Sequence, residues 1–196
     1  MKQDSVGYTS PFSENADLKY FFLGAGRGKV VQQIRDSVLG GMSFITLVAE
    51  EGDGKSMVCR KLQHHMPENV LCVSLTSHVE SFEEVIKQVF KEIDFTFKEE
   101  EKDLSVFEQF QLVKKSLEEA EQRLLIIFDE AEKLYLATLE RARKMLDQVN
   151  EQNVCVQMLL AGRSLFKENL KQLLLCNFDN SLEQHFQLEP LTGEET

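Results

Sequence analysis

The chain has 196 residues, of which 42% are hydrophobic and 28% are charged, with only 3 prolines and 10 glycines. This composition allows one well-buried core and excludes a collagen-like, low-complexity or wholly disordered chain. The formal net charge of -11 argues against extended binding to nucleic acid, which needs clustered lysine and arginine. The charge balance therefore disfavours nucleic acid as a partner, without excluding a local basic patch.

The apolar runs and the cysteines predict a cytoplasmic location. The longest apolar runs, Leu124–Phe128 and Met158–Ala161, are far shorter than the roughly 20 residues of a membrane-spanning helix. We therefore expect no membrane contact within this chain. The N-terminus, MKQDSVGYTS, lacks the basic-then-apolar pattern of a secretory signal. The four cysteines (59, 72, 155 and 176) show no metal-ligand or CxxC spacing, which favours free thiols in a reducing compartment.

Apolar runs alternate with amphipathic stretches along most of the chain. In chain order they predict a helix at Lys29–Leu39, a strand at Ser43–Ala49, a helix at Lys55–His65, a strand at Val70–Leu75, a helix opened by Ser81, an exposed acidic linker at Phe97–Asp103, a helix from Ser105 to about Glu121, a strand at Arg123–Asp129, a helix at Leu134–Val149, a strand at Val154–Ala161, a helix at Ser164–Leu175 and a strand at His185–Leu191. Apolar strands separated by helices predict an α/β fold, with a parallel sheet of about five strands between two helical layers.

The chain divides by pattern into three parts. Residues 1–42 are a linker and first helix, residues 43–191 are the α/β core, and residues 192–196 begin another element. The closing sequence LTGEET looks like a helix start cut off after one turn. We therefore expect a fragment of a longer protein.

The strongest chemical signal is AEEGDGKS, Ala49–Ser56, between a predicted strand and a predicted helix. Gly52 and Gly54 let backbone N–H groups and the helix N-terminus face a phosphate. Lys55 would reach the β- and γ-phosphates of ATP, and the Ser56 hydroxyl would bind Mg²⁺. The predicted nucleotide contacts are Ala49, Gly52, Asp53, Gly54, Lys55, Ser56 and Met57. Ala49 replaces the first glycine of the Walker A pattern. The alternative interpretation is that GDGKS is a chance polar turn.

A second motif, LLIIFDEAEKL, ends an apolar strand in two carboxylates. Asp129 would hold Mg²⁺ opposite Ser56, in the manner of a Walker B residue, and Glu130 would act as the catalytic base on water. The alternative is that both residues merely cap the next helix. The strand–helix–helix unit between the motifs favours the additional-strand class of P-loop NTPases, the AAA+ type.

A third candidate position follows the next predicted strand. Arg163 would face the γ-phosphate as a third catalytic residue, with Ser164 as the second choice, although Ser164 could simply cap the following helix. Two other patterns carry no site. GAGRG, residues 24–28, lacks the third glycine of a dinucleotide loop and leads into a helix, and the adjacent His64 and His65 cannot share one metal.

These motifs together resemble the ExeA-like AAA ATPases of the general secretion pathway. The resemblance rests on PFSENADLKYFFL, FITLVAEEGDGKSMVCRKL, LLIIFDEAEKL, VQMLLAGRSLF and LEPLTGEET. It implies a cytoplasmic ATPase domain whose C-terminal lid domain begins at residues 192–196 and is otherwise missing from this chain. In the secretion members a membrane anchor and a periplasmic region follow. It also implies ring assembly, a B-type secretion partner protein, and a role in placing the type II secretin or in pilus assembly.

The resemblance also implies that Pro11–Phe22 borders the adenine, with Tyr20 or Phe21 near the base. The family tends to have Gln where this chain has Arg163. It often has an arginine-rich run before the last strand, where residues 181–187 here contain no arginine. Two other functions stay open. One is a DNA-transaction ATPase of the transposition or replication-initiator type, and the other is a nucleotide-gated interaction module with little turnover.

Overall fold

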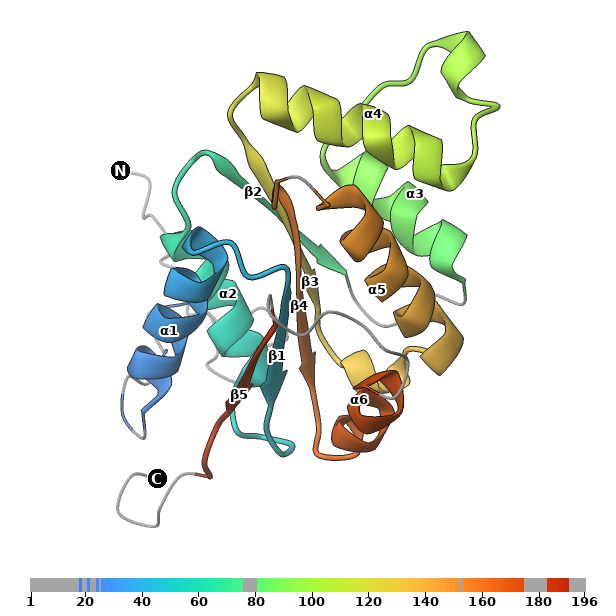
Figure 1. Cartoon of the computed structure of the whole chain (residues 1–196). Coiled ribbons are helices and arrows are strands. Elements are labelled where there is room, and N and C mark those ends of the chain that lie inside the picture. The colour runs from blue at the N-terminus through green and yellow to red at the C-terminus, as the bar shows by residue number, and fades with distance from the viewer. Residues whose placement is uncertain are drawn as a thin grey trace, which may run out of the picture.

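The computed structural model describes residues 18, 21, 24, 26–75, 81–151, 153–174 and 183–190. Its strands form one all-parallel sheet in the order β2-β3-β4-β1-β5 (Figure 1). The strands are β1 (Phe44–Val48), β2 (Val70–Leu75), β3 (Arg123–Phe128), β4 (Val156–Gly162) and β5 (Glu183–Gln187). The predicted parallel sheet is confirmed, and β4 is the additional strand between β1 and β3.

Helices cover both faces of the sheet. They are α1 (Arg27–Leu39), α2 (Lys55–His65), α3 (Phe82–Glu92), α4 (Val106–Glu119), α5 (Leu136–Val149) and α6 (Phe166–Leu174), with short 3₁₀ turns η2 (Glu99–Glu101) and η3 (Ala131–Lys133). Figure 1 shows α1 and α2 on one face and α3 to α6 on the other. The predicted α/β/α layering is therefore confirmed.

Alternation along the strands fills both layers of the core. Odd-numbered side chains of the central strands, such as Ile45, Leu125 and Leu159, pack with α1 and α2. Even-numbered ones, such as Ile126 and Leu160, pack with α3, α4 and α5. These central strands have no polar face, because helices cover both faces of the parallel sheet and exclude water from them. The same pattern made the strands recognisable from the sequence.

Helix α1 belongs to this core. Val31, Ile34 and Val38 pack against the sheet. The C-terminal carbonyls of α1 are also tied to it, because Arg123 Nη1 donates to the Val38 and Leu39 carbonyls at 3.2 and 2.9 Å. These contacts fix α1 to the sheet.

Some element boundaries differ from the sequence predictions. Helix α2 and strand β2 coincide with them, and Ser105 forms the predicted capping box with Glu108. Helix α1 begins at Arg27, and η2 lies inside the acidic linker. Strand β5 spans Glu183–Gln187, where His185–Leu191 was predicted. The Glu183 carboxylate is buried in an ion pair with Arg143, itself only 3% exposed. Hydropathy alone does not reveal a charged residue that is buried by pairing.

The division into residues 1–42, 43–191 and 192–196 stays a prediction, and residues 192–196 lie outside the described part. Across the residues that the structure describes, no helix combines the length and the apolar character that crossing a membrane requires.

Candidate functional site

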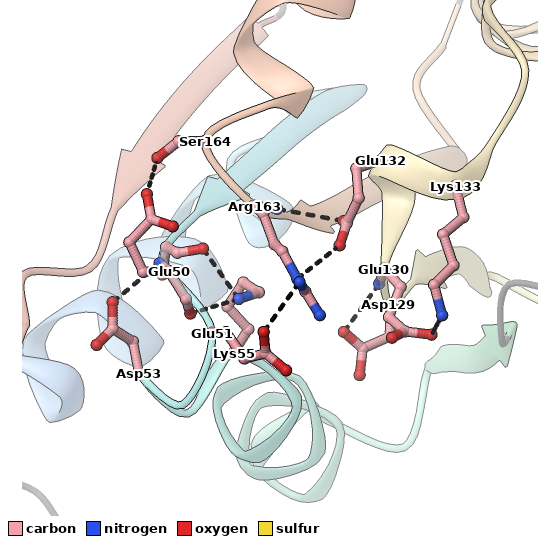
Figure 2. A network of polar contacts seen from close by, with 11 residues as sticks. Glu50, Glu51, Asp53, Lys55, Asp129, Glu130, Glu132, Lys133, Arg163 and Ser164 are labelled. Atoms are coloured by element: carbon pink, nitrogen blue, oxygen red, sulfur yellow. Dashed lines mark hydrogen bonds and ion pairs between the residues drawn. The ribbon is translucent and has the colours of Figure 1, made fainter.

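The predicted motifs meet at one edge of the sheet. The loop of residues 49–54 follows β1, Asp129 follows β3, and Arg163 follows β4. Because β3, β4 and β1 are adjacent parallel strands, their carboxyl ends lie side by side. Ligands of open α/β sheets bind at such edges. Figure 2 shows the side chains from these three segments converging there.

The loop after β1 depends on its glycines. Gly52 and Gly54 have φ angles of 84° and 87°, in the left-handed region that disfavours other L residues. Gly54 is the N-cap of α2, and its carbonyl accepts the first helical hydrogen bond from Val58 at 2.9 Å. This conformation turns the chain sharply into the helix. The free N–H groups and positive dipole end of α2 therefore face the sheet edge.

Lys55 is held by its own loop. Its side chain is buried, and Nζ donates to the carbonyl oxygens of Ala49 at 2.9 Å and Glu50 at 2.7 Å. The loop is closed further by the Glu50 N–H, which donates to the Asp53 carboxylate at 2.9 Å. These contacts keep the ammonium group in place beneath the loop without an anion.

The acidic pair after β3 forms a strained turn. Glu130 has a φ of 58°, which is uncommon for a residue with a long side chain. Its N–H donates to Asp129 Oδ1 at 3.0 Å, and its carboxylate pairs with Lys133 at 2.6 Å. Both members of that ion pair are substantially exposed, so the pair adds little stability. Strain of this kind is often found at functional sites.

A cavity of about 280 Å³ joins these segments. It is lined by Glu51, Gly52, Gly54, Lys55, Ser56, Met57, Asp129, Glu130, Glu132 and Arg163. Most of the predicted site residues thus share one cavity. Ala49 and Asp53 are not among its lining residues. Instead, the Ala49 carbonyl accepts a hydrogen bond from Lys55 Nζ, and the Asp53 carbonyl accepts one from Arg27 Nε.

Arg163 crosses the site between two carboxylates. Its Nη1 lies 3.0 Å from Glu51 Oε2, and its Nε lies 3.2 Å from Glu132 Oε1. The Arg163 backbone N–H also donates to Glu132 Oε2 at 3.2 Å. Nearby, the Ser164 hydroxyl donates to the Glu50 carboxylate. Arg163 therefore links the loop after β1 to the turn after β3 (Figure 2).

Three residues of this site were missed by the sequence analysis. Glu51 and Glu132 were passed over because an acidic residue in an acidic chain carries no motif signal. Their only sequence signal was proximity to Lys55 and Asp129. Arg27 was missed because GAGRG was interpreted as an incomplete dinucleotide loop that leads into a helix, and neither interpretation gives its arginine a role.

Arg27 supports the loop from behind. It is 4% exposed, and its Nε and Nη2 donate to the Asp53 carbonyl at 3.1 and 2.9 Å. Its Nη1 is buried without a hydrogen-bond partner in the described structure. Because the Asp53 carbonyl points toward α1, this contact helps hold the loop in the conformation that Gly54 permits.

We expect Arg27→Ala to loosen the loop. The variant loses two charge-assisted hydrogen bonds, at a cost of about 1.5–3 kcal/mol. Amide hydrogen exchange at Gly52–Ser56 should therefore accelerate by roughly tenfold or more. The matched control is Arg35→Ala, because Arg35 lies on the same helix and donates to the His65 carbonyl at 3.1 Å, at the far end of α2. Equal acceleration in both variants would show general loosening instead.

The residues present suit a magnesium ion. Within the described part of the chain, no three His, Cys, Asp or Glu side chains gather into a metal site. Mg²⁺ does not need such a cage, since it keeps several waters and takes one or two protein oxygens beside substrate phosphates. Ser56 and Asp129 supply such oxygens to the same cavity.

The described cysteines are free thiols. Burial raises the pKa of the Cys59 thiol, and the nearby Asp129 charge raises it further. Burial also raises the pKa values of Cys72 and Cys155 to about 11. All three thiols stay protonated near neutral pH, so they act as small apolar side chains. Cys176 lies outside the described residues.

The predicted adenine border is only partly described. Phe21 is half-buried against the cluster formed with α1 and α2, and Lys61 Nζ lies 5.8 Å from the centre of its ring. Tyr20 lies outside the described residues. The exposed His65 donates its Nδ1–H to the Lys61 carbonyl at 2.8 Å.

Comparison with known proteins agrees with this geometry. The chain is similar to general secretion pathway protein A of Aeromonas hydrophila, with 22% identity over 94% of this chain and 34% of that protein. This finding confirms the resemblance read from the motifs. The chain spans about a third of that relative's length.

Solved structures share the fold. Cdc6p of Pyrobaculum aerophilum superposes with a TM-score of 0.66 at 18% identity, over 95% of this chain and 49% of that one. The Aeropyrum pernix ORC2 protein, described in ADPNP-ADP complexes, superposes with a TM-score of 0.67 at 13% identity, over 90% of this chain and 50% of that one. At these identities the likeness concerns the fold alone.

A family model described as "AAA domain" matches residues 38–170, which include the loop after β1, the acidic pair and Arg163. This match covers more than half of the chain. The chain has the α/β fold of the P-loop NTPases and belongs to the AAA domain family.

Proposed function

We propose that this chain binds ATP with Mg²⁺ in the cavity at the sheet edge and hydrolyses it. The observation that carries the proposal is the shared cavity, where Lys55 and the α2 N-terminus face Asp129, Glu130 and Arg163. The loop offers N–H donors and a cation for phosphates, and the opposite wall offers carboxylates for a metal and a water. A cavity with donors on one side and acceptors on the other suits phosphoryl transfer to water.

Each residue has a proposed role. The N–H groups of Gly52–Ser56 bind the β-phosphate, and Lys55 leaves the loop carbonyls to contact the β- and γ-phosphates. Ser56 and Asp129 would hold Mg²⁺, which when bound neutralises charge on the phosphate oxygens. Glu130 orients a water and takes its proton as the water oxygen bonds to the γ-phosphorus. The bond to the bridging oxygen then breaks and ADP leaves.

We also propose a pathway for the complete protein. The similarity to general secretion pathway protein A supports a cytoplasmic ATPase that drives assembly of a bacterial envelope complex, such as a type II secretin or a pilus. The proposed partners are a B-type secretion protein and further copies of the chain in a ring. Deletion of the gene should leave secreted proteins or pilins cell-associated, and a Lys55→Ala allele should not restore export.

The direct test is titration calorimetry of ATP and ADP with Mg²⁺, followed by a phosphate-release assay. We expect saturable binding of both nucleotides and measurable turnover. Binding without turnover, even in a longer protein carrying the following domain, would favour the nucleotide-gated interaction module. An absence of binding in both proteins would contradict the proposal.

The DNA-transaction alternative needs its own measurement. The Aeropyrum pernix ORC1 protein, described in complex with DNA, shares the fold at a TM-score of 0.57 and 20% identity. A net charge of -11 gives this chain a poor surface for phosphate backbones. We therefore expect no salt-dependent DNA binding in fluorescence anisotropy. Micromolar binding that weakens steeply with added salt would favour the alternative.

A further inference from the structure

The two carboxylates that hold Arg163 are unequal. The Glu132 side chain is 10% exposed, and its two oxygens contact the guanidinium and the backbone N–H of Arg163. The Glu51 side chain is 77% exposed and contacts only Nη1. A nearly buried, two-point, charge-assisted contact is strong, whereas a single exposed ion pair contributes little. Glu132 is therefore the lasting partner of Arg163, and Glu51 is the exchangeable one.

The chemistry of the cavity indicates what replaces Glu51. Glu51, Arg163 and Lys55 line the same space. A guanidinium pairs with phosphate oxygens as readily as with a carboxylate. In the proposed ATP complex the γ-phosphate is the group that reaches past Lys55 toward the end of β4. A diphosphate has no such group, so it leaves the Glu51–Arg163 pair in place.

We propose that Glu132 positions Arg163, and that Glu51 occupies the outer N–H group of Arg163 until a nucleoside triphosphate displaces it. The two carboxylates then set the preference of the site for triphosphate over diphosphate. This inference rests on the proposed nucleotide function and deepens it. Glu51 lowers triphosphate affinity by competition, and Glu132 raises it by keeping the guanidinium aimed into the cavity.

The test of Glu51 is a double-mutant cycle with Arg163. Calorimetry would measure Mg²⁺-dependent binding of ADP and of a non-hydrolysable ATP analogue to the unmutated chain, Glu51→Gln, Arg163→Gln and the double variant. We expect Glu51→Gln to strengthen analogue binding about two- to fivefold, the range of an exposed ion pair. The gain specific to the analogue should vanish when Arg163 is replaced, because the competition needs both side chains.

Glu50→Gln is the matched control for loss of charge. Glu50 is the neighbouring loop residue, and its carboxylate contacts Ser164 rather than Arg163. Removing it changes the field around the phosphates by the same formal charge. We expect its effect on binding to be the same with Arg163 present or replaced.

Glu132→Gln tests the positioning role. The glutamine can still accept the Arg163 backbone N–H, but it loses the charge that holds the guanidinium. We expect the preference for the ATP analogue over ADP to fall by about tenfold while ADP affinity is unchanged. If Glu132 had a purely structural role, its replacement would weaken the binding of ADP and of the ATP analogue to the same extent.

The outcomes of these measurements distinguish a failure of this inference from a failure of the proposed nucleotide function. If Glu51→Gln acts equally on both nucleotides, or acts equally with and without Arg163, the competition is wrong and nucleotide binding stands. If Glu132→Gln weakens ADP and the analogue alike, the positioning role is wrong. If neither the unmutated chain nor the longer protein that carries the following domain binds any nucleotide, the proposed function and this inference fall together.

Discussion

Replacing Lys55 with alanine should abolish nucleotide binding. In the proposed complex the ammonium group contacts two phosphates, and each charge-assisted contact contributes about 1.5–3 kcal/mol. Loss of both weakens binding by at least roughly 100-fold, beyond the range of a standard calorimetric titration. Lys55→Arg should also bind poorly, because the buried position at the cavity wall accommodates a compact ammonium group, and a larger planar guanidinium cannot take the same place beside the phosphates.

The matched control is Lys115→Ala. Lys115 is 74% exposed on α4 and forms only a long, 3.9 Å pair with Glu119. The variant has the same net charge as Lys55→Ala but leaves the loop intact. It should bind ATP like the unmutated chain. If Lys55→Ala bound ATP as well as Lys115→Ala does, the loop would not be a phosphate site.

The fold was predictable because its signals are local and repeated. In α3 the apolar side chains recur at the spacing of a helix: Phe82, Val85, Ile86, Val89 and Phe90 are buried, and Ile93 is partly buried. Strand β3 is buried on both faces, as its unbroken apolar run indicated. Each of these elements carries its own pattern, and parallel strands joined by helices leave few alternative topologies.

The candidate site residues that belong to a sequence motif could be predicted, and the residues outside the motifs could not. Lys55, Ser56 and Asp129 were predicted as site residues because of the motifs around them, and the structure places them on the wall of one cavity. Arg27 and Glu132 act through contacts between segments that lie 26 and 31 positions apart in sequence. No local pattern marks such contacts, since they depend on which strands become neighbours.

Glu130→Gly should separate stability from activity. The φ of 58° at Glu130 costs about 1–2 kcal/mol in any L residue, and glycine relieves it while losing about 0.5–1 kcal/mol to chain entropy. We expect the free energy of unfolding to rise by about 0.5–1 kcal/mol, which raises the melting temperature by roughly 1–4 °C. We also expect ATP turnover to fall by about 10²- to 10⁴-fold, because the base that activates the water is gone.

Glu121→Gly is the control for this strain. Glu121 has a φ of 53° and is exposed beyond α4, away from the residues that line the cavity. The same substitution there should give a similar gain in stability with unchanged turnover. Glu130→Gln should lose turnover without the gain in stability, since it keeps the strained backbone. If Glu130→Gly instead destabilised the fold, the Glu130 side chain would stabilise the turn by more than the backbone strain costs. If Glu130→Gln kept full turnover, Glu130 would not be the base, and the base would have to be sought elsewhere on the cavity wall.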